Sequence, residues 1–151
     1  MGTTGFRSAN TVYQVVIDTY VLIAALRSKR GASHQLLRTL GDPRWQMNIS
    51  TALILEYEEI MSRTAVHGGL SPAMDAILDR ICALGTECDI FFRWRPHLRD
   101  PDDDFLLELA VRAHCDFIIT YNTRNFAGAA DFGIELVTPG EFLKRIEEEA
   151  R

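Results

Sequence analysis

The fold is decided by the stretch Asp100-Pro-Asp-Asp-Asp-Phe-Leu-Leu-Glu-Leu-Ala-Val-Arg-Ala-His-Cys-Asp-Phe-Ile-Ile-Thr120. Asp100 is a favourable N-cap and Pro101 suits the first helical position, so we expect a helix to begin here. The apolar residues that follow recur at helical spacing, and the short apolar run 117–120 predicts a strand. A helix that leads directly into a buried strand is typical of α/β proteins.

The faces of this helix carry different kinds of residue. Asp104, Glu108 and Arg112 recur every four positions, which predicts a solvated polar row. Asp103 instead lies in line with the apolar residues, on or beside the face that packs inward. Because a carboxylate at the rim of an apolar face needs a partner, Asp103 is the first candidate site residue.

Short apolar runs and helical patterns alternate along the rest of the chain. Further strands are predicted at 12–17, 45–49, 87–92 and 134–137. Helices are predicted at 19–26, 33–40, 51–63 and 72–83, and a last one after the capping box of Thr138 and Glu141. The alternation predicts one domain over residues 1–151, a three-layer α/β/α sandwich with a central parallel sheet.

Charge is unevenly distributed along the 151 residues, whose net charge is −5. Residues 1–49 hold six Lys or Arg against two Asp, whereas the remainder holds ten against nineteen acids. A local basic patch can contact phosphates even in an acidic protein. No apolar run approaches the roughly 20 residues of a membrane helix, and residues 1–11 lack the apolar core of a signal peptide. We therefore expect a cytoplasmic protein without a membrane partner.

Three carboxylates are candidates for one site, because sites in parallel sheets lie at the carboxyl ends of the strands. Asp18 ends the strand 12–17, Glu56 lies beside a helical apolar stripe, and Asp103 is the third. Gathered together they would repel one another, and a hard divalent cation such as Mg²⁺ or Mn²⁺ would relieve that repulsion. Taken singly, each has an ordinary interpretation as a helix cap, an arginine partner or a dipole-complementing acid. The residues alone leave the choice open.

Four stretches resemble the motifs of PIN-domain ribonucleases, in order and at suitable spacing, over about residues 12–143. They are Val-Val-Ile-Asp18-Thr-Tyr-Val-Leu-Ile-Ala-Ala-Leu, Leu-Glu56-Tyr-Glu-Glu-Ile-Met, Asp-Pro-Asp-Asp103-Asp-Phe-Leu-Leu-Glu-Leu-Ala and Phe-Ile-Ile-Thr-Tyr-Asn122. The chain is most similar to the bacterial branch of toxins in toxin–antitoxin systems. The resemblance implies a metal-dependent endoribonuclease that is occluded by an antitoxin protein.

Residue roles follow from that resemblance. It implies that Asp18, Glu56 and Asp103 bind the Mg²⁺ or Mn²⁺ and that the hydroxyl of Thr19 supports the site. We prefer Asp103 to Asp104 as the third ligand, because both the motif register and the helix phase favour it. Asp104 is the second choice.

Two departures from the family pattern favour a different function. Tyr20 stands where the family usually has asparagine, and Asn122 where it often has a fourth aspartate. Neutral Asn122 can offer its carbonyl oxygen to a metal or hydrogen-bond a bound water, but it adds no charge. The alternative is therefore a degenerate PIN fold that binds RNA or protein without cleavage. A phosphoacceptor receiver domain is disfavoured, because the only lysine after Lys29 is Lys144, in the last helix.

Basic residues near the expected site are candidates for phosphate contacts. They are Arg27, Lys29 and Arg30 after the first helix, and Arg124 beside Asn122. Their alternative role is to complement the C-terminus of the helix. The expected partners are single-stranded or structured RNA, an antitoxin protein, and a second copy of the chain through the apolar helix around 71–84.

Overall fold

The computed structural model describes residues 11–64, 71–88, 101–123, 126 and 128–149, with backbone alone for 101–105 and 149. The strands are β1 Tyr13–Ile17, β2 Trp45–Ile49, β3 Thr86–Glu87, β4 Phe117–Ile119 and β5 Glu135–Val137. The helices are α1 Thr19–Arg27, α2 Ala32–Arg38, α3 Thr51–Thr64, α4 Pro72–Leu84, α5 Pro101–Arg112 and α6 Pro139–Glu149, with the short 3₁₀ helix η1 Ala129–Phe132.

The five strands form one parallel sheet in the order β3-β2-β1-β4-β5. β1 lies at the centre, and its residues Val15, Val16 and Ile17 are fully buried. Such continuous apolar runs are expected where helices cover both faces of a parallel sheet. The register pairs Ile17 with Ile119, so β1 and β4 end side by side. The predicted parallel α/β architecture is confirmed.

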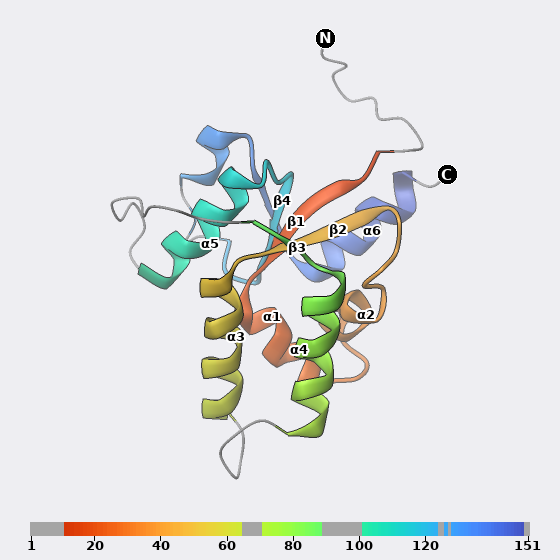
Figure 1. The fold of residues 1–151 in the computed structure, drawn as a ribbon. Coiled ribbons are helices and arrows are strands. Elements are labelled where there is room, and N and C mark those ends of the chain that lie inside the picture. Colours follow the sequence, from red (N-terminus) through yellow and green to blue (C-terminus); the bar gives the residue numbers. More distant parts are fainter. Residues whose placement is uncertain (1–10, 65–70, 89–100, 124–125, 127, 150–151) are drawn as a thin grey trace.

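Helices cover the sheet on both sides (Figure 1). The chain moves in one direction from β1 to β2 and β3, then crosses back to β4 and β5 through α5. Right-handed crossovers place helices on opposite faces when the direction reverses. α5 packs against β1, β2 and β4, while α1, α2 and α6 pack together in the other layer. None of the described helices is long and apolar enough to cross a membrane.

The last helix is positioned by its capping box and by an aromatic cluster. The backbone N–H of Thr138 donates to Glu141 Oε1 at 2.8 Å, and the N–H of Glu141 donates to Thr138 Oγ1 at 3.2 Å. These reciprocal bonds confirm the predicted helix start. Phe142, one residue later, packs edge-to-face against Phe117 and Trp45, with ring centroids 5.5 and 5.6 Å apart. The start of α6 is therefore fixed to the sheet.

Two details differ from the sequence-based expectations. The strand predicted at 87–92 is β3, Thr86–Glu87; residues 89–92 lie outside the described part of the chain. The predicted solvated row on α5 is wrong at Glu108, whose side chain is only 3% exposed. α5 packs against α3 as well as against the sheet, so it buries a wider arc than one apolar stripe. A periodicity argument cannot detect that second packing surface.

Candidate active site

Asp18 lies where β1 ends, between the two halves of the sheet. Its backbone N–H donates to the carbonyl of Ile119 at 2.9 Å, which continues the β1–β4 pairing by one residue. From β1 the chain turns to β2 on one side, whereas β4 lies on the other side. In this class of fold, ligands bind outside the carboxyl ends of the parallel strands, at the point where the strand order reverses. Asp18 therefore occupies the position at which a site is expected.

The Asp18 carboxylate is oriented from both sides. Thr120 Oγ1 donates to Asp18 Oδ2 at 2.7 Å. The backbone N–H of Tyr20 lies 3.5 Å from Asp18 Oδ1, and Asp18 is the N-cap of α1. The helix-cap interpretation of Asp18 is thus confirmed, and it is compatible with a site because the cap holds the carboxylate at the end of β1.

Glu56 is connected to the residue next to Asp18. Thr19 Oγ1 donates to Glu56 Oε2 at 2.6 Å, and the Thr19 side chain is 1% exposed. α3 begins just after β2, at the same edge of the sheet, with Ser50 capping the backbone N–H of Leu53 at 3.2 Å. α3 also packs against α1, which brings the half-buried Glu56 to Thr19. The predicted supporting role of Thr19 now has a specific contact.

Tyr57 lies beneath the two carboxylates. It is fully buried, and its hydroxyl donates to the backbone carbonyl of Ile17 at 2.6 Å. Burial raises the pKa of Tyr57 well above its ordinary value of 10, and the negative charges of Asp18 and Glu56 raise this pKa further. The hydroxyl therefore remains a donor that holds the end of β1. Tyr57 was not among the predicted site residues, although its position next to Glu56 was a usable signal.

Tyr57→Phe is expected to lower the free energy of unfolding by about 1–3 kcal/mol, because the carbonyl of Ile17 loses a buried donor. Urea unfolding followed by circular dichroism measures this difference. Tyr20→Phe is the matched control: its hydroxyl belongs to a side chain that is 62% exposed, so we expect a change within about 0.5 kcal/mol. Equal stabilities of wild type and Tyr57→Phe would show that the Tyr57 hydroxyl has no structural role.

Thr120 joins Asp18 to the loop after β4. Its hydroxyl accepts from the backbone N–H of Asn122 at 3.0 Å while it donates to Asp18. The backbone of Asn122 is thus held close to the site, and its side chain is exposed. Thr120 was not among the predicted site residues. A hydroxyl residue at the end of the strand neighbouring Asp18 was the signal for it.

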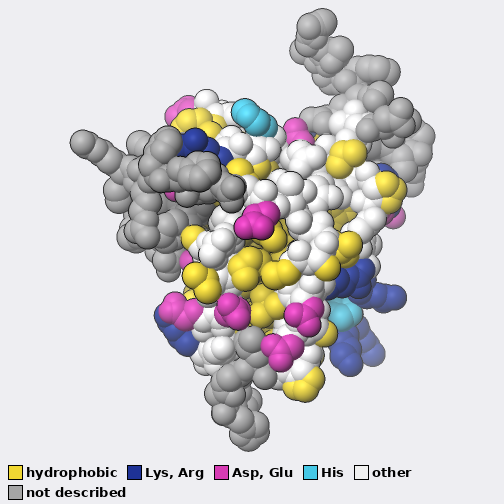
Figure 2. Space-filling model, in the orientation of Figure 1, with side chains coloured by type: hydrophobic (Ala, Val, Ile, Leu, Met, Phe, Trp, Pro, Cys, Tyr) yellow, Lys and Arg dark blue, Asp and Glu magenta, His cyan; other side chains and the backbone are white. Residues whose placement is uncertain are grey.

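Other predicted residues lie outside this arrangement or outside the described part of the chain. The backbone of Asp103 and Asp104 begins α5, but their side chains are not among those described, and neither is Arg124. Arg27, Lys29 and Arg30 are exposed at the far end of α1, and a nine-residue helix is about 13 Å long. Figure 2 shows Lys and Arg side chains gathered over this side of the molecule, whereas acids lie over α3 and α4. The structure does not bring these three basic residues against the carboxylates.

The side-chain oxygens of this candidate site suit a hard cation. Asp18 and Glu56 present carboxylate oxygens, and threonine hydroxyls orient both of them. Oxygen donors of this kind fit Mg²⁺ or Mn²⁺. Within the described residues, no group of three or more His, Cys, Asp or Glu side chains is arranged to hold a metal. Asp103, the third predicted ligand, has no described side chain and is not part of that group.

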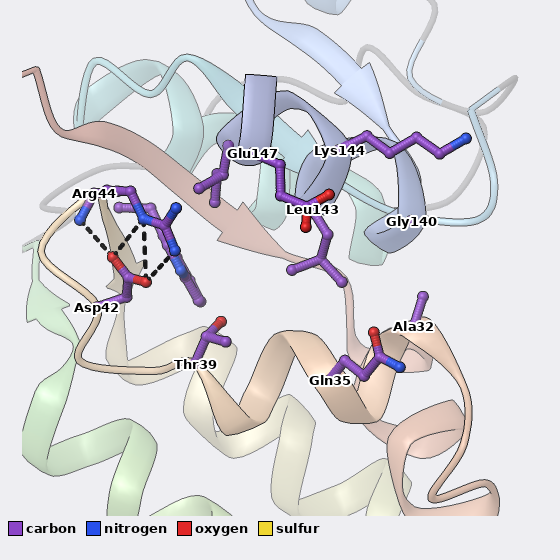
Figure 3. A pocket seen from close by; sticks show the side chains of 11 residues that line it. Ala32, Gln35, Thr39, Asp42, Arg44, Gly140, Leu143, Lys144 and Glu147 are labelled. Carbon is purple, nitrogen blue, oxygen red and sulfur yellow. Dashed lines mark hydrogen bonds and ion pairs between the residues drawn. The ribbon is translucent and has the colours of Figure 1, made fainter. Parts of the chain in front are cut away.

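A separate cavity of about 360 Å³ lies between α2 and α6 (Figure 3). Its wall includes Gln35, Trp45 and Lys144, with the ion pair of Arg44 and Asp42 at 2.7 Å. Trp45 begins β2, whereas Asp18 follows the end of β1. Because the strands are parallel, the cavity lies toward their amino ends, whereas Asp18 lies at their carboxyl ends. None of the predicted site residues whose side chains are described lines it.

A comparison with protein families finds a match over most of the chain. The sequence model of the PIN domain matches residues 14–124, well over half of the chain. The match begins in β1 and ends just after Asn122, so it spans Asp18, Glu56 and Asp103. PIN domains are generally nucleases and typically use divalent metals. No curated protein matches the sequence.

Proposed function

This chain belongs to the PIN domain family, and from that membership we propose that it is a metal-dependent endoribonuclease, the toxin of a bacterial toxin–antitoxin pair. One observation carries the proposal. Asp18 lies where the strand order of the sheet reverses, and its carboxylate accepts a hydrogen bond from Thr120. Glu56 accepts a hydrogen bond from Thr19, the residue after Asp18. Two oriented carboxylates at this position are a suitable start for a Mg²⁺ or Mn²⁺ site.

Each residue has a role in this proposal. Asp18 and Glu56 bind the metal, and Asp103 supplies the third carboxylate from the first turn of α5. Thr19 and Thr120 hold the two carboxylates in place, since outer-shell partners of metal ligands fix their orientation. Asn122 offers a neutral side chain at the rim. A bound ion lowers the pKa of its water and stabilises charge on a phosphodiester oxygen.

Metal removal is the direct test. Purified protein is expected to cut a mixed single-stranded RNA in Mn²⁺ or Mg²⁺ and to lose this activity in EDTA, with recovery when the metal is restored. Gel analysis of the products measures it, and the Asp18→Asn protein serves as a control for contaminating nucleases. Cleavage that persists in EDTA would contradict the metal-dependent mechanism.

A binding module without cleavage activity is the alternative. It is favoured by Tyr20, which is 62% exposed next to Asp18 in place of the asparagine that the family resemblance implies. It is also favoured by Asn122, which adds no charge. A wild-type protein that binds RNA yet cuts it under no metal would support this alternative. Tyr20→Asn would then test whether the tyrosine blocks activity.

The toxin role has its own test. Support for it comes from the resemblance of the motifs to those of bacterial toxins. Induced expression in a bacterial host is expected to arrest growth, whereas the Asp18→Asn protein at an equal level is not. We expect co-expression of an antitoxin protein that occludes the site to restore growth. Normal growth with abundant, RNA-cleaving wild-type protein would overturn the toxin role while leaving the nuclease in place.

A further inference from the structure

Two exposed tyrosines lie close in the chain to the groups that bond the Asp18 carboxylate. Tyr20 is 62% exposed and donates its backbone N–H to the Asp18 carboxylate. Tyr121 is 50% exposed and directly follows Thr120, whose hydroxyl bonds the other oxygen of the same carboxylate. Single exposed apolar residues are common on proteins and need no explanation. Two exposed tyrosines that are connected to the same carboxylate, one through its own backbone N–H and one through the preceding Thr120, are a more specific arrangement.

Tyr121 is fixed in orientation although half of its surface is exposed. Its hydroxyl lies 2.5 Å from the hydroxyl of Ser33, and Ser33 is 1% exposed in the first turn of α2. The polar end of the ring is thus attached to a rigid helix, while the ring itself remains accessible. Tyrosine has only two side-chain torsions, so a ring held in this way loses little entropy when a ligand stacks on it.

The contact with Ser33 also connects the site to the basic turn. Lys29 and Arg30 lie in the turn between α1 and α2, a few residues before Ser33, and both are exposed. Tyr121 therefore bridges the end of β4 and the start of α2, beside this turn. Aromatic rings next to a positively charged surface are the combination with which proteins bind single-stranded nucleic acids.

We propose that Tyr20 and Tyr121 stack on unpaired bases of a single-stranded RNA whose backbone passes Asp18 and continues toward Lys29 and Arg30. The inference rests on the proposed nuclease function and assigns the contact with unpaired bases to two particular residues of this chain. Bases in a duplex are already stacked and paired, so their faces cannot reach a protein ring. Bases in a single strand can.

Binding of RNA by a non-cleaving protein tests this proposal. In the Asp18→Asn protein with Mg²⁺, fluorescence anisotropy of a labelled oligoadenosine of about 12 nucleotides measures affinity. Tyr20→Ala and Tyr121→Ala are each expected to weaken binding about tenfold, within the range found for loss of one base-stacking ring. Tyr20→Trp is expected to retain binding and to add tryptophan fluorescence that the RNA quenches. Tyr121→Phe keeps the ring but loses the Ser33 contact, so we expect a smaller loss.

Phe132→Ala is the matched control, because Phe132 is 48% exposed and precedes β5. It therefore lies toward the amino ends of the parallel strands, whereas Asp18 lies at their carboxyl ends. We expect it to bind like the parent protein, and we expect a duplex of the same length to bind about equally to all variants. Unchanged affinity in both alanine variants, or a parent protein that does not bind the single strand, would overturn the proposal. The proposal would also be overturned if the two alanine variants bound RNA like the parent protein and had lost binding only to a protein partner. This assay measures binding in a protein that does not cleave RNA. A failure of the proposed nuclease activity, which the cleavage assay tests, can therefore be distinguished from a failure of base stacking.

Discussion

Asp18→Asn is expected to lower the rate of RNA cleavage at least about a hundredfold, with the fold intact. The asparagine keeps one oxygen, which can accept either from Thr120 or from the backbone N–H of Tyr20 at the start of α1. It removes the negative charge that we propose binds the metal. Loss of outer-shell partners of metal ligands typically costs about 10–100-fold, and a ligand itself is expected to cost more. Single-turnover cleavage at saturating Mn²⁺ measures the rate, and thermal unfolding verifies the fold.

Thr120→Val provides a graded comparison for this prediction. It removes only the hydroxyl that donates to Asp18 Oδ2 at 2.7 Å and leaves the carboxylate in place. We expect a loss of about 10–100-fold, smaller than that of Asp18→Asn. Asp18→Asn with wild-type activity would remove Asp18 from the site, and with it the proposed mechanism.

Asp103→Asn is expected to lower cleavage as strongly as Asp18→Asn, whereas Asp104→Asn is expected to stay within a few-fold of wild type. The residues in line with Asp103 on α5 are Leu106, Leu107 and Ala110, which are 3%, 0% and 0% exposed. This confirms that the face in line with Asp103 packs inward. The burial of Glu108, in line with Asp104, makes helix phase a weaker reason than the sequence alone indicated. The preference for Asp103 over Asp104 as the third ligand therefore rests on the motif register.

The two neighbouring variants are matched in charge and in position on the first turn of α5. Cleavage rates together with the Mn²⁺ concentration that gives half-maximal activity separate their roles. A strong loss in Asp104→Asn with normal activity in Asp103→Asn would reverse the assignment. Equal, mild losses in both would mean that α5 supplies no ligand.

Much of the fold was predictable because its signals are local. The strand at 45–49, the start of the helix at residue 72 and the capping box at Thr138 are read from a few adjacent residues, and each lies where it was expected. The burial of Glu108 was not predictable, because it depends on α3 as a second neighbour of α5. The single domain over residues 1–151 and the side-chain roles of Asp103 and Arg124 stay predictions.

The sequence by itself determined the order of the elements, the parallel sheet and the place of Asp18 at a strand end, since periodicity and helix caps act over a few residues. Only the tertiary structure decided which side chains orient the carboxylates. Thr120 and Asp18 are 102 positions apart, and Thr19 and Glu56 are 37 apart. Contacts over such separations depend on strand order and helix packing. Patterns over a few neighbouring residues do not determine strand order or helix packing.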